Sequence, residues 1–244
     1  MWGVIMKVNS TKLIAVVLSL ILLFTTLLMI VSKNEFFTDT FNSTKNEILI
    51  IVDAGHGGED GGAVAPDNSF EKDYNLDIAL KLETILKVYG CKVIMTRTDD
   101  RMTCDDNLKS QRQKKISDIK NRFDVIKKHN NAVFVSIHQN KFSDSRQKGA
   151  QVFYSPNNLK SKTLADCIQQ SIVKNLQKDN RRLTKKSGTD IYLLYHSTVP
   201  SVLVECGFLS NQSDLTLLKN DSYRREIAFL IADGIIEYYK LQVI

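Results

Sequence analysis

Two histidines and two glutamates occupy positions from which their side chains could do chemistry together. His56, His138 and Glu205 each follow or end a short apolar run, and Glu71 lies soon after the first histidine. Two neutral imidazoles and one carboxylate are a typical catalytic zinc set, with a fourth position left for water. A further carboxylate can then serve as a general base. The four residue types therefore indicate metal-assisted hydrolysis.

The local pattern leaves the roles of the two glutamates open, since either could bind the metal and either could be the base. Each residue also has a structural explanation when it is taken alone. A histidine at a strand end often only packs, and an acid in a first helical turn, such as Glu71, often interacts with the helix dipole. Glu205 is harder to explain, because a carboxylate beside a buried strand costs roughly several kcal/mol unless it is paired or metal-bound. The four together favour a metal site.

The residues around His56 predict a buried strand that ends in a sharp turn. Residues 48–52 are apolar and rich in β-branched side chains, and the run is too short for a helix. Glycines at 55, 57 and 58 allow the backbone to turn closely beside the imidazole. Ligand sites of open α/β sheets lie just beyond the carboxyl ends of the strands. We therefore expect His56 at such an edge.

Strands and helices alternate along the rest of the chain. Apolar runs predict further strands at 91–96, 132–140, 149–154, 189–194 and 199–205. Helical spacing predicts helices at 70–89, 110–130 and 159–178, then a short one from 215 and a long one at 222–241. Ser69 or Asn68 is expected to cap the first helix, and Gly90 to end it. This order predicts an α/β single domain with a central mixed, mostly parallel sheet flanked by helices.

The N-terminal region predicts a transmembrane helix before this domain. Residues 13–32 carry no charge, and as a helix they would span about 30 Å. Lys7 and Lys12 precede them, which places the N-terminus in the cytoplasm. A cleaved signal peptide is the alternative, but it usually has a shorter apolar core. The expected organisation is a membrane anchor at 1–34, a tether at 35–46, and an exported catalytic domain at 47–244 on the outer face of the cytoplasmic membrane.

The charge of the chain argues against nucleic acid as a partner. The net charge is +6, but Lys7, Lys12 and Lys33 lie in the N-terminal segment without any acid, which leaves +3 for the remainder. This excess is mild, and an exported domain meets an anionic wall or membrane surface instead.

Cysteine spacing excludes a thiolate zinc site, because no pair has the Cys-x-x-Cys pattern. Export permits disulfides, but the apolar contexts of three of the four cysteines favour free thiols. A cysteine hydrolase is the least expected class. Cys206 follows Glu205 within a strand and should point to the opposite face of the sheet.

Four segments together resemble the zinc-dependent N-acetylmuramoyl-L-alanine amidases, a family also called amidase 3. They are Val52-Asp-Ala-Gly-His-Gly-Gly58, Glu71-Lys-Asp-Tyr-Asn75, Ser136-Ile-His-Gln-Asn140 and residues 202–211, in the order usual for the family. The resemblance implies a sandwich of a mixed sheet between helices. It also implies one zinc ion per chain bound by His56, Glu71 and His138, with Glu205 as the catalytic acid/base.

Additional residues are weaker candidates for orienting the ligands or binding substrate. Asp53 and Asn140 are two of them, because zinc-bound histidines usually need orienting partners. The family often has an arginine in the helix before its Ser-Ile-His strand, and Arg112 or Arg122 could take that place. Gln139 departs from the alanine that is usual there.

The nearest subgroup consists of membrane-anchored, single-domain amidases of spore-forming bacteria. That resemblance implies hydrolysis of the amide between N-acetylmuramic acid and L-alanine. It also implies removal of stem peptides from cortex peptidoglycan for muramic-δ-lactam formation, at the forespore envelope. The alternatives are a zinc peptidase or deacetylase acting on another wall substrate, and a catalytically weak peptidoglycan-binding protein. An activating protein partner that completes the site is a further expectation.

Overall fold

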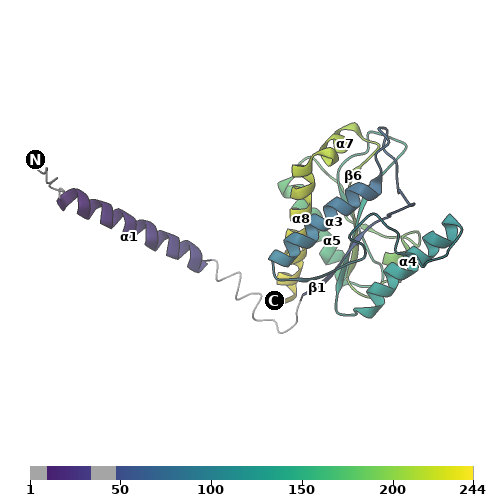
Figure 1. The fold of residues 1–244 in the computed structure, drawn as a ribbon, viewed down its shortest axis with the longest axis horizontal. Coiled ribbons are helices and arrows are strands. Elements are labelled where there is room, and N and C mark those ends of the chain that lie inside the picture. The colour runs from purple at the N-terminus through teal and green to yellow at the C-terminus, as the bar shows by residue number, and fades with distance from the viewer. Residues whose placement is uncertain (1–9, 34–47, 244) are drawn as a thin grey trace, which may run out of the picture. The chain divides into compact units, whose positions relative to one another are not determined.

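A computed structural model describes residues 10–33 and 48–243. The chain divides into two units, Met1–Asn46 and Glu47–Ile244, which are described separately. In the first unit, α1 spans Ser10–Lys33 (Figure 1), and its large apolar side chains are exposed wherever the structure describes them. A search of the described residues found no helix that is long and apolar enough to cross a membrane. The tether expected at 35–46 lies outside the described residues.

The second unit is built on one six-stranded mixed sheet with the order β2-β1-β3-β6-β4-β5. All neighbouring strands are parallel except β4 and β6, which are antiparallel. The strands are β1 Leu49–Ala54, β2 Lys92–Met95, β3 Val133–Asn140, β4 Gln151–Tyr154, β5 Lys185–Lys186 and β6 Ser201–Phe208. The predicted mixed, mostly parallel sheet is confirmed.

Helices cover both faces of this sheet. They are α3 Glu71–Val88, α4 Gln111–Lys128, α5 Lys160–Asn175, α6 Tyr192–His196, α7 Gln212–Lys219 and α8 Asp221–Val243. Helices α3 and α5 both pack against α8 on one face, whereas α4 packs against α6 on the other (Figure 1). The single α/β domain expected from the sequence is therefore confirmed.

Apolar side chains that pack against the sheet fix the positions of its polar residues. On the α4 side, Ile51, Phe134 and Leu203 from three adjacent strands form a cluster with Leu194 of α6. Burial of each such side chain contributes about 1.5–3 kcal/mol. This packing fixes the strand register, and with it the places of the residues that follow along each strand.

The strand predicted at 189–194 is wrong, because α6 occupies part of this segment. Leu194 is fully buried and Ile191 packs against the same cluster, while Tyr192 is exposed. A spacing of three between the inward side chains fits a helical turn and not an alternating strand. The edge strand is instead the short β5.

The start of α3 also differs from expectation. Its N-cap is Phe70, with no side-chain cap, so neither Ser69 nor Asn68 caps the helix. Instead, the N–H groups of Glu71 and Lys72 donate to backbone carbonyls of the Gly-rich loop, at 2.9 and 3.2 Å. Because the loop carbonyls accept from these N–H groups, the helix start needs no side-chain cap, and the Glu71 side chain points into the site.

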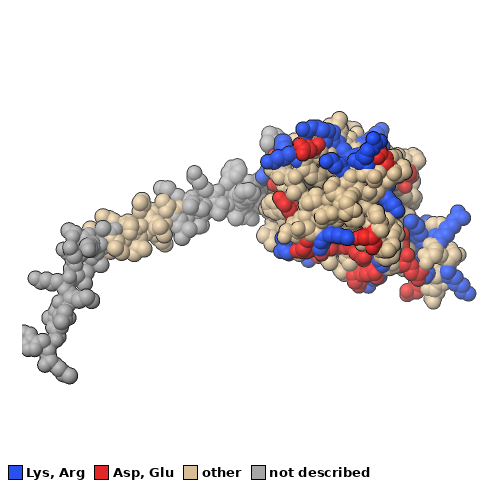
Figure 2. Space-filling view, turned by 90° about the horizontal axis from the view of Figure 1, so that it is seen from above, with Lys and Arg blue, Asp and Glu red and all other residues tan. Residues whose placement is uncertain are grey.

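The surface and the cysteines agree with the sequence analysis. Figure 2 shows Lys and Arg interspersed with Asp and Glu over the face in view. All four cysteines are free thiols, and Cys206 is fully buried. Burial also raises the pKa of the Cys206 thiol, with the charge of Glu205 adding to this effect, so Cys206 is poorly suited to act as a nucleophile.

Candidate metal centre and active site

Three parallel strands bring the polar residues to one edge of the sheet. His56 lies in the turn after β1, while His138 and Glu205 lie near the carboxyl ends of β3 and β6. His138 and Glu205 are register partners on these adjacent strands. Both strands run slightly past these residues, and a bulge follows His138. His56 therefore lies just beyond the end of its strand, whereas His138 and Glu205 are set into the rim of the sheet.

The Glu71 carboxylate links the two histidines. Its Oε2 lies 3.2 Å from His56 Nε2, and its Oε1 lies 2.9 Å from His138 Nδ1. One ligand atom from each of the three residues lies within 4.8 Å of the other two. Two imidazole nitrogens and a carboxylate oxygen at this spacing fit the donor set that zinc takes in hydrolases.

Backbone and amide donors fix the same carboxylate in place. The N–H groups of Ala63 and Gln139 donate to it at 2.9 and 3.1 Å, and Asn75 Nδ2 donates at 3.2 Å. Burial would raise the pKa of Glu71, but its bonds to both histidines hold that pKa well below its usual range. The side chain is therefore a fixed anion at neutral pH.

His56 adopts an unusual backbone conformation that turns its ring towards this carboxylate. Its φ is +62°, a left-handed value that few non-glycine residues adopt. Its Nδ1 contacts Asp60 Oδ2 at 3.0 Å, which fixes the ring from the other side. Burial disfavours the charged ring, but Asp60 and Glu71 raise the pKa of His56 to about 9.

Glu205 is the one carboxylate of the cluster without a direct partner. The residue is partly exposed, yet its Oε2 atom is buried and has no hydrogen-bond partner among the residues that the structure describes. Burial, together with the nearby Glu71 charge, raises the pKa of Glu205 to about 7. Such a carboxyl group can both accept and donate a proton near neutral pH.

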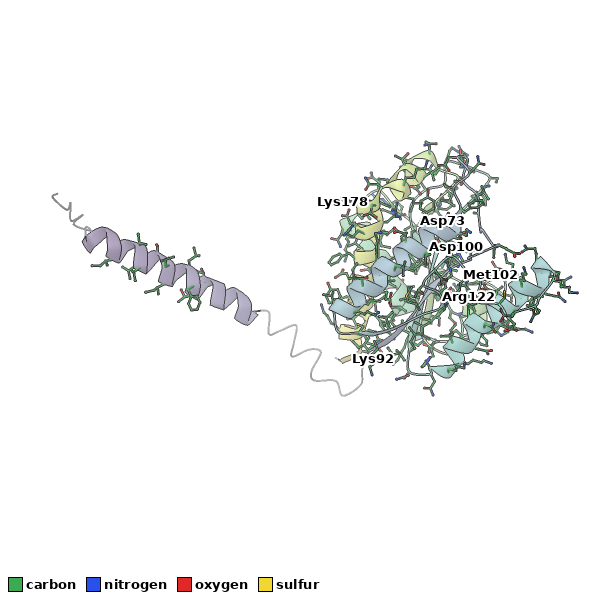
Figure 3. All side chains as sticks on the ribbon, viewed as in Figure 1. Asp73, Lys92, Asp100, Met102, Arg122 and Lys178 are labelled. Atoms are coloured by element: carbon green, nitrogen blue, oxygen red, sulfur yellow. The ribbon has the colours of Figure 1, made fainter. Side chains whose placement is uncertain are left out.

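The residues expected to orient the ligands have different places in the structure. Asp53 is buried and pairs with Arg122 of α4 at 2.6 Å, and Arg122 also donates to the His56 carbonyl at 2.7 Å. Figure 3 labels Arg122 on the side of α4 that faces the sheet. Arg112 is exposed on α4, so of the two arginines only Arg122 reaches the site. The Asn140 side chain makes no hydrogen bond within the described part of the chain, although its carbonyl accepts one from Leu209.

Sequence reasoning missed three residues that contact the ligands or their backbone. Asp60 lies four residues after His56 in the Gly-rich loop, and this proximity was a usable signal. Asn75 lies one helical turn after Glu71 on the same face, which was a second signal. Arg97 lies just after β2, is 1% exposed and donates to the carbonyls of Ala54 and Gly55. No local pattern identifies it.

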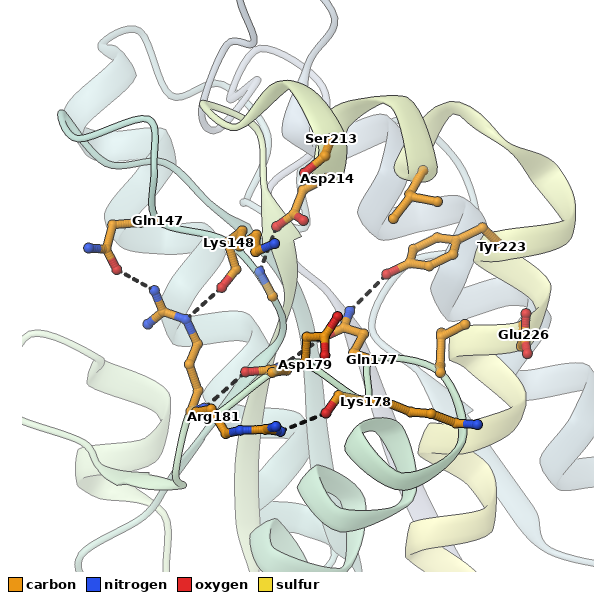
Figure 4. Close-up of a pocket in the computed structure, with 15 residues that line it drawn as sticks. Gln147, Lys148, Gln177, Lys178, Asp179, Arg181, Ser213, Asp214, Tyr223 and Glu226 are labelled. Atoms are coloured by element: carbon orange, nitrogen blue, oxygen red, sulfur yellow. Dashed lines mark hydrogen bonds between the residues drawn. The ribbon is translucent and has the colours of Figure 1, made fainter.

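Several hollows open on this unit, and one of them is lined by two of the four candidate residues, His56 and His138. A cleft of about 250 Å³ is lined by His56 and His138, by Lys115 of α4 and by Tyr192 of α6. A hollow of about 820 Å³ lies between the 147–149 loop, the 176–182 loop and α7 and α8 (Figure 4). It contains none of the four candidate residues. The cleft that contains the two histidines is therefore the candidate substrate site.

Comparison with known proteins agrees with this geometry. Residues 50–237 match the family described as N-acetylmuramoyl-L-alanine amidase. The chain belongs to this family. Enzymes of this family hydrolyse an amide of peptidoglycan, and the chain is accordingly an N-acetylmuramoyl-L-alanine amidase.

The amidase is similar to several individual proteins over most of its length. It is 35% identical to a germination-specific N-acetylmuramoyl-L-alanine amidase of Bacillus subtilis, covering 78% of this chain and 79% of the relative. It shares 43% identity and a TM-score of 0.76 with the CwlD amidase from Clostridioides difficile, whose structure was solved in complex with the GerS lipoprotein. This match covers 80% of this chain and 100% of the CwlD chain. The catalytic domain of CwlV from Bacillus (Paenibacillus) polymyxa shares 31% identity with this chain at a TM-score of 0.66. That match covers 79% of this chain and 98% of the CwlV domain. These likenesses identify a CwlD-type amidase.

Proposed function

We propose that the amidase binds one zinc ion through His56, Glu71 and His138 and uses Glu205 as its catalytic acid/base. The convergence of the three ligand atoms within 4.8 Å carries this proposal. A second support is the buried Glu205 Oε2 beside that cluster, which has no hydrogen-bond partner within residues 10–33 and 48–243. An unpaired buried oxygen is costly, and a reacting water would satisfy it.

The residues of the chain divide the work of amide hydrolysis between them. When bound, zinc polarises the amide carbonyl and makes water a stronger nucleophile near neutral pH. Glu205 Oε2 takes a proton from the attacking water and gives it to the departing L-alanine nitrogen. Asp60 and the donors around Glu71 hold the ligand side chains in place, as partners of metal ligands commonly do.

The test compares full-length wild type with Glu205→Gln and, as a matched control, the exposed Glu237→Gln. Zinc content and release of stem peptides from purified peptidoglycan are both measured, with the products analysed by mass. We expect Glu205→Gln to keep its zinc but to lose at least about 100-fold in rate, while the control stays unchanged. A wild-type rate in Glu205→Gln would refute the assigned role. Products without a free L-alanine amino group would instead indicate a zinc peptidase or deacetylase.

We further propose that the substrate is spore-cortex peptidoglycan, trimmed for muramic-δ-lactam formation at the forespore envelope. The germination-specific name of the Bacillus subtilis relative supports this setting. Expression in a Bacillus subtilis strain that lacks its own germination-specific amidase should restore muramic-δ-lactam in the cortex. A cortex that still lacks the lactam would argue against this role.

A protein partner and a membrane anchor complete the proposal. The similar CwlD amidase was solved with a lipoprotein, and we infer that this amidase also assembles with an exported protein. Residues 13–32 carry no charge and lie within α1, which supports an anchor at 1–34, a tether at 35–46 and a catalytic domain at 47–244. Extraction of membranes with alkaline carbonate should leave the full chain in the pellet and release a chain that starts at residue 35.

A further inference from the structure

Arg97 donates four hydrogen bonds to backbone carbonyls although it is almost completely buried. Its acceptors are the carbonyls of Ala54 at 2.9 Å, Gly55 at 3.0 Å, Lys72 at 2.9 Å and Asp99 at 3.0 Å. We propose that Arg97 is a positioning residue that ties the His56 turn to the start of α3 and thereby sets the affinity of the site for zinc. This inference rests on the proposed metal site.

The turn that carries His56 is held through its backbone carbonyls. Donors from three separate elements converge on its carbonyls. The carbonyl of Ala54 accepts from both Arg97 and Arg122, and that of Gly55 accepts from both Arg97 and Asn75. His56 itself is held at a φ of +62°. A strained backbone of this kind persists only where its surroundings over-determine it, and Arg97 contributes two of these bonds.

The helix that carries Glu71 is bound to the same guanidinium. The carbonyl of Lys72, the next residue, accepts from the same Arg97 Nη2 that donates to Gly55. A second link runs parallel to this one, because Asp100 accepts from Gly58 N and from Lys72 Nζ, at 2.8 and 2.7 Å. The guanidinium therefore lies between two elements that each carry one proposed ligand. A shift of either element would change the spacing of His56 and Glu71.

Only an arginine can fill this place. The planar guanidinium presents its donors in a fixed fork that reaches several acceptors at once, whereas a lysine has one compact ammonium group on a flexible stem. Arg97→Lys keeps the charge but loses the fork. It therefore tests geometry separately from charge.

The experiment measures zinc affinity in the full chain by competition with a chromophoric chelator, on samples whose folding is checked by circular dichroism. Orienting partners of metal ligands are typically worth about 10–100-fold in metal affinity, and we expect a loss of this size in Arg97→Lys. The exposed Arg101→Lys is the matched control and should bind zinc normally. Leu164→Ala, in the core of α5, should lower the Tm without changing zinc affinity, which separates positioning from general stability.

A measurement on wild-type protein keeps the inference testable if Arg97 variants do not fold. If Arg97 favours zinc binding, zinc must equally favour the bonds of Arg97, because coupling is reciprocal. In protein that contains nitrogen-labelled arginine, zinc loading should slow hydrogen exchange at Arg97 Nε–H more than at Arg224 Nε–H, which donates to Asp77 of α3. Equal slowing at both, or wild-type zinc affinity in Arg97→Lys, would overturn the role of Arg97. Wild-type protein that binds no zinc would overturn the metal site itself.

Discussion

Replacing Asp53 by Asn tests how the sheet and α4 together support the active site. Asp53 is 1% exposed, and its Oδ1 accepts from Arg122 Nη1 at 2.6 Å and from Thr96 Oγ1 at 2.7 Å. Its Oδ2 accepts from Ser136 Oγ at 2.5 Å. Asparagine has nearly the same size but no charge, so the variant leaves buried Arg122 with Asp118 as its remaining ion-pair partner.

Two estimates give the size of the expected effect. Burial alone would raise the pKa of Asp53, but Arg122 and the hydroxyls of Ser136 and Thr96 lower it from 3.8 to about 2. Since each pKa unit corresponds to about 1.4 kcal/mol, the charged form stabilises the fold by about 2 kcal/mol. Removing one partner of a buried ion pair typically costs about 3–5 kcal/mol. We therefore expect a loss of about 2–5 kcal/mol at neutral pH, or roughly 4–20 °C in Tm.

The pH dependence gives the sharper test. The folded pKa of Asp53 lies below its ordinary value, so its contribution is complete above about pH 4 and is lost as the pH falls through about 2. The difference in free energy of unfolding between wild type and Asp53→Asn should therefore become smaller as the pH falls from about 4 to about 2. Urea unfolding of chelator-treated protein measures this difference without a contribution from bound metal. The more exposed Asp124→Asn serves as control. A gap that is small at neutral pH, or that does not change with acid, would refute the reasoning.

Three further predictions follow from single contacts. Gly55→Ala would place a Cβ 2.3 Å from the His138 ring and so displace this proposed ligand. A zinc titration should therefore show at least about tenfold weaker binding. Wild-type zinc affinity in the variant would contradict the close approach. Ser110→Ala removes the acceptor of the capping box at the start of α4. Thermal unfolding should show a free energy of unfolding lower by about 1 kcal/mol, while zinc affinity stays unchanged. An unaltered Tm would count against the cap. Gly234→Ala in α8 would place a Cβ 2.5 Å from the Ile168 backbone in α5. Urea unfolding should show a free energy of unfolding lower by about 1–3 kcal/mol. Wild-type stability in the variant would show that α5 and α8 can separate at little cost.

The sequence by itself determined most strands of the sheet and the chain order of the chemical residues. Residues 48–52 and 132–140 are apolar runs whose burial favours strands, and this preference is local enough to be read directly. Glycines around His56 indicated a turn for the same reason. Even Cys206, one residue after Glu205, could be assigned to the opposite face of the sheet, because side chains alternate along a strand.

Only the tertiary structure decided which of the expected partners reach the four candidates, and only it revealed Arg97. Arg97 bonds to Ala54, 43 residues earlier in the chain, and Arg122 bonds to the His56 carbonyl across 66 residues. Such contacts depend on how β2, α4 and the turn pack together, and nothing in the local sequence of either partner records them. Helix α6 shows the same limit, since its segment could form a strand by propensity, and packing of Leu194 into the core selects the helix. Local periodicity therefore specifies the elements, whereas long-range packing specifies the partners that hold a reactive group in place.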